Sequence, residues 1–321
     1  MRKIIKTLLG IGGAFCLIGA LLFSIGFTSG GTKYVHDTNL NSMNAQEDNK
    51  ESANRFTLKK TEIPDFTSLN INLEDSDLNI EESPNEKSYI EYAQATKDKK
   101  NPVSYSIENG TLTLKEAGNT GASYYINVDI SFLQAALSSK NIEDYTKESS
   151  KYENYVTLYL PKDKLVSSAK IYLGYGDFYV KNATFDTTNI KLDDGDFDAN
   201  TLTANSGKLT FSYGDCDLQK ASLGNISLTS KDGDLTVNEL TLSGKTKIAL
   251  SYGDAEITLN DSTKKVSGFD LATHYGTSTA SGRNGNKTLD EDDDGNTFQS
   301  DSKDGKTKLL IDSKDGDITV K

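Results

Sequence analysis

Aspartate residues recur at a nearly constant interval through the middle of the chain, each directly after a glycine. Carboxylates stacked on successive rungs of a β structure would lie about 5 Å apart, where like charges repel unless amides or cations compensate. Either each aspartate accepts backbone N–H groups at its own turn, or calcium binds between rungs. We adopt the first interpretation, because the glycine-rich nonapeptide of calcium-binding β-rolls is absent. The column comprises Asp177, Asp196, Asp215, Asp234 and Asp254, with Asp193, Asp194 and Asp198 as further carboxylates nearby.

A second acidic segment lies near the end of the chain and resembles a calcium-binding loop of the D-x-D-x-D-G type. No helical pattern flanks it, so the usual frame of such a loop is missing, and a solvated acidic loop is the favoured interpretation. Gly295 also stands 19 residues after Gly276, as one more drifted repeat turn would. The candidate calcium ligands are Asp290, Asp292, Asp294 and Asp301.

The residue before each repeated glycine alternates between tyrosine and aspartate. If one repeat forms one rung, the tyrosines recur about every 10 Å along one edge of the stack. Such a row could stack on sugar rings or anchor a protein partner, while packing at the turn is the alternative. The candidate binding residues are Tyr175, Tyr213 and Tyr252, with Asp194 and Asp232 between them.

Residues suited to acid–base or nucleophilic catalysis are scarce. The chain has two histidines, His36 and His274, and two cysteines, Cys16 and Cys216. Cys216 occupies a position that Phe, Leu or Ala fills in neighbouring repeats, so it is predicted to be a buried apolar residue. We therefore predict a protein that is not an enzyme, with a glycan lyase or hydrolase on a β-helix as the remaining catalytic alternative.

The repeated glycines show which architecture positions these side chains. Their intervals are 19, 19, 19 and 20 residues, and a fixed period of this size indicates a stacked repeat protein. Apolar residues lie five and three positions before each glycine and two, four and nine positions after it, which is the alternation of strands with one buried face. The repeated glycines are Gly176, Gly195, Gly214, Gly233 and Gly253.

This pattern predicts an all-β fold, a β-solenoid with rungs of 19–20 residues. The apolar positions change parity across the glycine, so a bend there is needed to keep both sets inward. Each repeat then consists of two short strands, a Gly-Asp corner and a polar return. Whether a repeat forms a whole coil or half of a flattened one is left open by the pattern.

The composition excludes one class of partner. A formal charge of −12 and only three arginines argue against nucleic acid binding, which requires a basic face. An acidic surface is suited to solubility or to cationic molecules.

Residues 1–31 are predicted to form a basic cytoplasmic tip and one transmembrane helix, because residues 7–27 carry no charge. The basic flank places the rest of the chain outside the cell membrane, as a single-pass protein with an extracytoplasmic C-terminal domain. A cleaved signal peptide is the alternative. Residues 32–59 are polar and predicted to be a flexible tether.

The remaining chain divides into two predicted parts. Residues 60–165 form an atypical capping β region, with a hairpin at Asn109-Gly110 and an inserted helix or loop over 117–155. Residues 166–321 form the regular solenoid, with looser rungs toward the C-terminus.

The Gly-Asp repeats, the opening FTSLNINLEDSDLNI and the lead-in VTLYLPKDKL resemble the bacterial putative-adhesin Gly-Asp β-strand-repeat family, a domain of unknown function that includes LiaG-like cell-envelope proteins. The resemblance covers about residues 60–321 and is strengthened by the closing SKDGDITV. It implies a membrane-anchored extracytoplasmic repeat protein associated with envelope-stress systems, and it implies no catalytic residues and no cofactor.

We therefore expect a non-catalytic interaction or structural module of the cell envelope, whose partner is an envelope component or a membrane protein. A surface adhesin that binds glycan or host protein is the alternative. The short tether favours the first, because it keeps the module close to the membrane.

Overall fold

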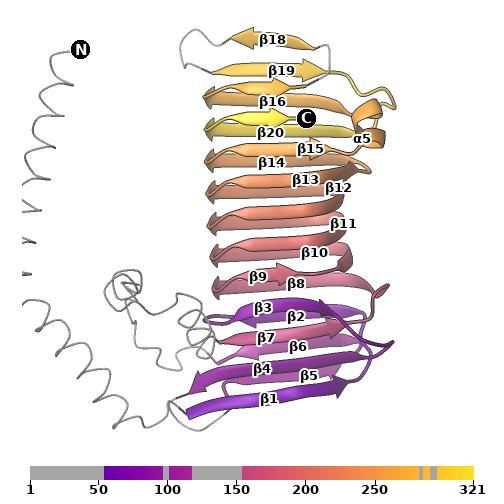
Figure 1. Cartoon of the computed structure of the whole chain (residues 1–321), viewed down its shortest axis with the longest axis vertical. Coiled ribbons are helices and arrows are strands. Elements are labelled where there is room, and N and C mark those ends of the chain that lie inside the picture. The colour runs from indigo at the N-terminus through magenta and orange to yellow at the C-terminus, as the bar shows by residue number, and fades with distance from the viewer. Residues whose placement is uncertain (1–53, 97–100, 118–153, 282–284, 290–294) are drawn as a thin grey trace, which may run out of the picture. The chain divides into compact units, whose positions relative to one another are not determined.

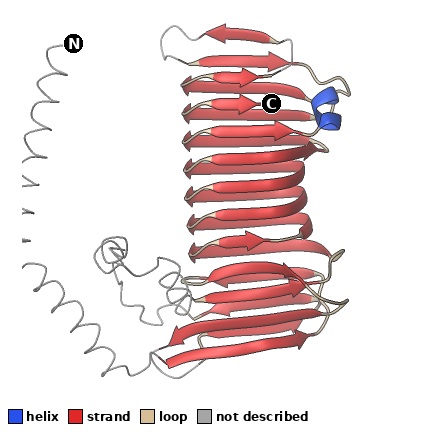
Figure 2. Cartoon of the chain, in the orientation of Figure 1, coloured by secondary structure: helices blue, strands red, loops and turns tan. Residues whose placement is uncertain are grey.

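The computed structural model describes residues 54–96, 101–117, 154–281, 285–289 and 295–321. Residues Arg55–Lys321 form one compact unit. Within the described ranges the chain is almost entirely β, with a single short helix (Figure 2). The all-β prediction is therefore confirmed.

The centre of this unit is a stack of parallel coils (Figure 1). Each residue pairs with the one 19 or 20 positions later, as Ile190 does with Leu209 and Leu228 with Ile248. One repeat is thus one complete coil. The strands are β8 (Leu165–Tyr175), β9 (Phe178–Val180), β10 (Ala183–Asp194), β11 (Phe197–Tyr213), β12 (Cys216–Asp232), β13 (Leu235–Leu242), β14 (Lys245–Tyr252) and β15 (Ala255–Leu259).

Each coil buries three pairs of side chains. The sequence pattern predicted two strands and a polar return, but the return is also β structure and buries the third pair. In β11 the additional buried pair is Leu202 and Ala204, of which only Ala204 was predicted. The missed inward position lies seven residues after the glycine, in a stretch rich in Thr and Asn that hides the alternation. Its members are Ala183, Leu202, Ala221 and Leu240.

The C-terminal rung lies inside the stack and not at its end. It comprises β20 (Lys308–Asp315) and β21 (Ile318–Val320). On one side these strands pair with β14 and β15, and on the other with β16 (Gly268–Tyr275) and β17 (Ser278–Ala280). The helix α5 (Asp261–Val266), capped by Asn260, connects β15 to β16, so the chain skips one rung and fills it later (Figure 1).

The opening rung is inserted in the same way at the other end. It consists of β2 (Ser68–Leu73) and β3 (Asp77–Glu82), which pair with β8 and β9 on one side. On the other side they pair with β6 (Thr111–Glu116) and β7 (Tyr155–Leu160). The core therefore consists of columns of inward side chains whose rungs the chain visits out of order. One such column comprises, in spatial order, Leu114, Ile71, Ile171, Ile190, Leu209, Leu228, Ile248, Ile311 and Leu271.

Antiparallel strands cover both ends of the stack. At the N-terminal end β5 (Val103–Glu108) pairs with β6 through the predicted hairpin at Asn109-Gly110, where both residues have positive φ. There β4 (Ser88–Thr96) pairs with β7 and with β1 (Asn54–Ile63). At the other end β19 (Asn296–Ser300) lies between β16 and β18 (Asn286–Leu289). Gly295, which precedes an antiparallel strand, is not a drifted Gly-Asp corner.

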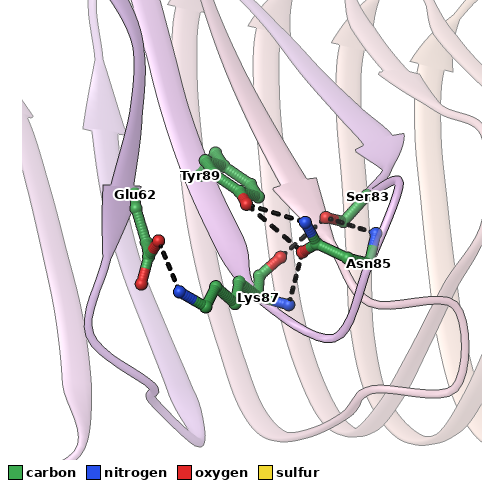
Figure 3. Close-up of polar contacts among 5 residues, drawn as sticks. All are labelled: Glu62, Ser83, Asn85, Lys87 and Tyr89. Atoms are coloured by element: carbon green, nitrogen blue, oxygen red, sulfur yellow. Dashed lines mark hydrogen bonds and ion pairs between the residues drawn. The ribbon is translucent and has the colours of Figure 1, made fainter.

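The loop between β3 and β4 is held by its own polar groups (Figure 3). The Ser83 hydroxyl donates to the Lys87 carbonyl at 2.7 Å, and the Lys87 N–H donates to Asn85 Oδ1 at 2.9 Å. The Lys87 ammonium reaches Glu62 Oε2 on β1 at 2.8 Å, and Asn85 Nδ2 donates to the Tyr89 hydroxyl at 2.9 Å. These contacts are internal to the cap and explain its compact turn.

Several predictions concern residues outside the described ranges. They are the membrane anchor over residues 1–31, the tether as far as residue 53, most of the inserted segment, and Asp290, Asp292 and Asp294. The end of the predicted tether, residues 54–59, is described and belongs to strand β1, which pairs with β4, and is therefore not part of a flexible segment. Within the described ranges no helix has the length and apolarity needed to cross a membrane. Cys216 is described, and it is buried between Phe197 and Leu235 as predicted. Burial raises the pKa of its thiol well above the usual value.

We expect a Gly214→Ala substitution to destabilise the stack strongly. Gly214 has φ +113°, and an added Cβ would lie 2.3 Å from the Gly195 carbonyl oxygen. The unfavourable φ alone costs about 1–2 kcal/mol, and the backbone contact adds to it. The control is Gly305→Ala, because Gly305 also has positive φ, +67°, but an added Cβ meets nothing within 4 Å. Urea unfolding should show a much larger loss in the free energy of unfolding for Gly214→Ala than for Gly305→Ala. Equal losses would contradict the idea that the close approach of successive rungs requires glycine.

Glu116 leads to a prediction about pH. Its buried carboxylate accepts the backbone N–H groups of Glu74 and Asp75 at 2.8 and 3.0 Å, and burial raises its pKa above the ordinary value of 4.5. A raised pKa in the folded state contributes stability that is present at low pH and lost as pH rises through that pKa. Glu116→Gln should therefore gain stability relative to the unmodified protein between pH 4 and pH 7, measured by urea unfolding. The exposed Glu108→Gln should show no such gain, and equal behaviour of the two variants would contradict the prediction.

Candidate functional site

The repeated glycines form one corner of each central coil, and each is required there for two reasons. Their φ angles lie between +113° and +148°, a region that side chains with Cβ rarely adopt. In addition, an added Cβ at Gly195 or Gly233 would lie 2.2 or 2.1 Å from the carbonyl oxygen of the glycine one rung below. The corner therefore brings backbones of successive rungs closer than any other residue type permits.

The aspartates that follow these glycines link the rungs through their side chains. Asp177 Oδ1 accepts the backbone N–H of Asp196 at 2.8 Å, and Asp196 Oδ1 accepts that of Asp215 at 2.8 Å. The same bond repeats along the stack and gives an unbroken ladder from Asp77 to Thr277. Its members in spatial order are Asp77, Asp177, Asp196, Asp215, Asp234, Asp254, Asp317 and Thr277.

This geometry corrects one sequence prediction. The aspartates were expected to accept N–H groups at their own turns, whereas each accepts from the next rung. The inserted rungs take part in the ladder. Asp77 of the opening rung accepts the N–H of Asp177 at one end, and Asp317 of the C-terminal rung lies between Asp254 and Thr277 at the other. The carboxylates therefore act as connections between coils.

The calcium hypothesis stays a prediction for both sets of aspartates. Among the residues that the structure describes, no three His, Cys, Asp or Glu side chains gather as a metal ion would require. Of the four candidate ligands in the acidic segment only Asp301 is described, and it is exposed. Elsewhere, His274 is exposed, and its Nε2 lies 3.6 Å from Asp312 Oδ1 on the outer surface.

The residues before the glycines form a second column on the same edge. Tyr175, Tyr213 and Tyr252 are 55–57% exposed, and Tyr275, which sequence reasoning missed, is 55% exposed. Tyr252 and Tyr275 belong to consecutive coils of the chain, yet Asp315 of the inserted rung pairs with both. The strict alternation is thereby kept. In spatial order this alternating column is Tyr175, Asp194, Tyr213, Asp232, Tyr252, Asp315 and Tyr275.

The edge that carries both columns, here called the Gly-Asp edge, is strongly acidic. Within the described ranges no lysine or arginine forms an ion pair with a carboxylate of the ladder between Asp177 and Asp317 or of the alternating column. On the adjoining face, burial and then Asp217 raise the pKa of Asp198, with the ladder aspartates adding to the effect. Exposed Lys231 and Lys314 directly precede Asp232 and Asp315, but the carboxylates of the two columns outnumber them, so the charge around the exposed tyrosine rings is negative on balance.

The chain belongs to the Toastrack family DUF4097, whose model matches residues 66–321. No curated protein matches it. Among solved structures, similar ones are a "putative cell adhesion protein" of Clostridium sporogenes (13% identity, 82% of this chain and 99% of the other, TM-score 0.36) and a "putative adhesin" of Bacteroides fragilis (12%, 83% and 97%, 0.38). A third is a "putative adhesin" of Parabacteroides distasonis (10%, 83% and 96%, 0.37). The family match over residues 66–321 confirms the resemblance inferred from the sequence at the level of the family.

We expect Asp196→Ala to destabilise the stack and Asp196→Asn to be tolerated. Alanine leaves the Asp215 N–H without its acceptor, at a cost of about 1 kcal/mol at this exposed site. Asparagine keeps an acceptor oxygen and removes one charge from a repelling row. Urea unfolding should place Asp196→Ala below both Asp196→Asn and the surface control Asp163→Ala. If Asp196→Ala and Asp196→Asn unfold at the same urea concentration, the inter-rung bond does not contribute.

Proposed function

We propose that this protein is a non-catalytic binding module of the bacterial cell envelope that contacts its partner through the Gly-Asp edge. The observation that carries the proposal is the row of exposed tyrosines at a regular spacing along that edge. Four of the five large apolar side chains exposed in the described ranges are Tyr175, Tyr213, Tyr252 and Tyr275, and the other is Leu165. Aromatic residues gathered on one face are typical of a recognition surface.

The architecture supports this role because a stacked solenoid presents an extended, rigid binding surface. Parallel hydrogen bonds and the aspartate ladder hold each rung in register, so the tyrosine spacing is determined by the backbone and not by loops. The edge presents phenol rings and carboxylates. These groups are suited to binding, and none of the described residues of the edge forms a pair of nucleophile and base.

The location of the module is the second part of the proposal. The uncharged stretch over residues 7–27, with basic residues before it, supports an anchor in the cell membrane and a domain on its outer side. Such a position, close to the membrane, is suited to contact with an envelope component or a membrane protein, including a role in envelope stress. Protease treatment of intact protoplasts tests it: the domain should be digested from outside, and full protection would overturn the location.

We expect replacement of all four tyrosines by serine to weaken binding of the purified protein to isolated cell envelopes by about tenfold or more, since each exposed ring contributes on the order of 0.5–1 kcal/mol. Co-sedimentation with envelopes measures the effect, and circular dichroism checks that the fold is retained. The matched control is Leu165→Ser, because Leu165 is 53% exposed but lies away from the glycine corners. Unchanged binding of the four-tyrosine variant would overturn the proposed surface. Envelopes stripped of protein that still bind fully would instead favour a glycan adhesin.

A further inference from the structure

We propose that the Gly-Asp edge binds an extended polycationic polypeptide segment whose basic residues recur at every third position. This inference rests on the proposed function, in that the same edge is the binding surface, and it names the chemical class of the partner. Three features carry it: the composition of the alternating column, an internal contact of the same kind, and the spacing of the rungs.

The composition of the edge selects a cation. Each exposed tyrosine ring has a carboxylate on the neighbouring rung of its own column, as Tyr213 has Asp194 on one side and Asp232 on the other. The aspartate ladder runs parallel to this column one residue beyond the glycine. A guanidinium or ammonium group can contact a ring face and a carboxylate together, which strengthens both interactions. An anionic polymer would meet repulsion from both rows of carboxylates, which outnumber the two exposed lysines, Lys231 and Lys314, that directly precede Asp232 and Asp315.

The protein already contains this arrangement within one pair of rungs. Tyr172 and Lys191 pair in register, and the Lys191 Nζ lies 5.0 Å from the centroid of the Tyr172 ring. The same ammonium lies 2.7 Å from Asp193 Oδ1, while the Tyr172 hydroxyl donates to Asp193 Oδ2 at 2.9 Å. A lysine thus rests on a tyrosine ring one rung away and pairs with a carboxylate beside it. The alternating column offers the ring and the carboxylate with the cation still to be supplied.

The rung spacing selects the conformation of the partner. Successive tyrosines are two rungs apart, about 9.6 Å. A polyproline II helix rises about 3.1 Å per residue and has three residues per turn, so every third side chain points the same way at intervals of about 9.3 Å. A β-strand repeats its facing side chains about every 6.7 Å and falls out of step with the tyrosines. Four contacts, from Tyr175 to Tyr275, therefore require a segment of about ten residues.

The test compares two fluorescent twelve-residue peptides of the same composition, one with arginine at every third position among prolines and the other with the arginines grouped together. Fluorescence anisotropy with the full-length protein in detergent measures the dissociation constants. The periodic peptide should bind about tenfold more tightly than the grouped one, and raising the salt from 50 to 300 mM should weaken it severalfold. Replacing the four tyrosines by serine should weaken binding of the periodic peptide about tenfold, and so should replacing Asp194, Asp232 and Asp315 by asparagine. Leu165→Ser should leave binding unchanged.

The other outcomes separate this inference from the proposed function. Equal binding of the two peptides would overturn the matched spacing, since it would indicate only general attraction to acidic groups. If neither peptide binds while tyrosine-dependent binding to envelopes persists, the polycationic partner is overturned and the binding edge stands. If an uncharged oligosaccharide binds instead, independently of salt, the partner is a glycan and the inference is likewise overturned. Loss of tyrosine dependence in both assays would overturn the proposed function as well.

Discussion

The close approach of successive backbones at the glycine corner is the constraint on which the rest of the structure depends. With positive φ and no Cβ, each glycine lets the carbonyl of the rung below enter space that any other side chain would occupy. At that distance the backbone N–H of the residue after the glycine donates to the aspartate carboxylate of the neighbouring rung. The residue before the glycine lies on an exposed edge. The corner thus sets the register, the ladder and the position of the tyrosine rings together.

Both ends of the stack resolve the problem of unpaired strand edges in the same way. The opening rung and the C-terminal rung each lie between two others, and antiparallel strands then cover the outermost coils. An open parallel edge would invite pairing with another chain. Because the two inserted rungs have the same glycine or aspartate positions as the central ones, they extend the Gly-Asp edge without interruption. The C-terminal rung also supplies Asp315, which preserves the alternation between Tyr252 and Tyr275.

The Gly-Asp edge combines a rigid spacing with a distinct chemistry, and the proposed function depends on both. A surface whose spacing is determined by inter-rung hydrogen bonds can recognise a partner by its repeat length, which flexible loops cannot do. For the proposed partner the acidic edge favours neutral or cationic groups, and the contact among Tyr172, Lys191 and Asp193 is an example of a cation held by a tyrosine ring and a carboxylate. The ladder aspartates have a structural role, whereas the aspartates of the alternating column are the ones that the proposed recognition uses.

The sequence by itself determined the all-β class, the rung length, most of the core and the family. Glycine spacing and apolar alternation are local properties, and each repeat shows both of them again. It also predicted that Tyr175, Tyr213 and Tyr252 form a row along one edge of the stack. It missed the inward position of Leu202 and its equivalents, since short polar residues hide the alternation there, and it placed the aspartate bonds within single turns. Only the tertiary structure decided the spatial order of the rungs. The position of a rung in the stack depends on pairing between residues as far apart in the sequence as Tyr252 and Asp315, and local sequence patterns do not predict such pairing.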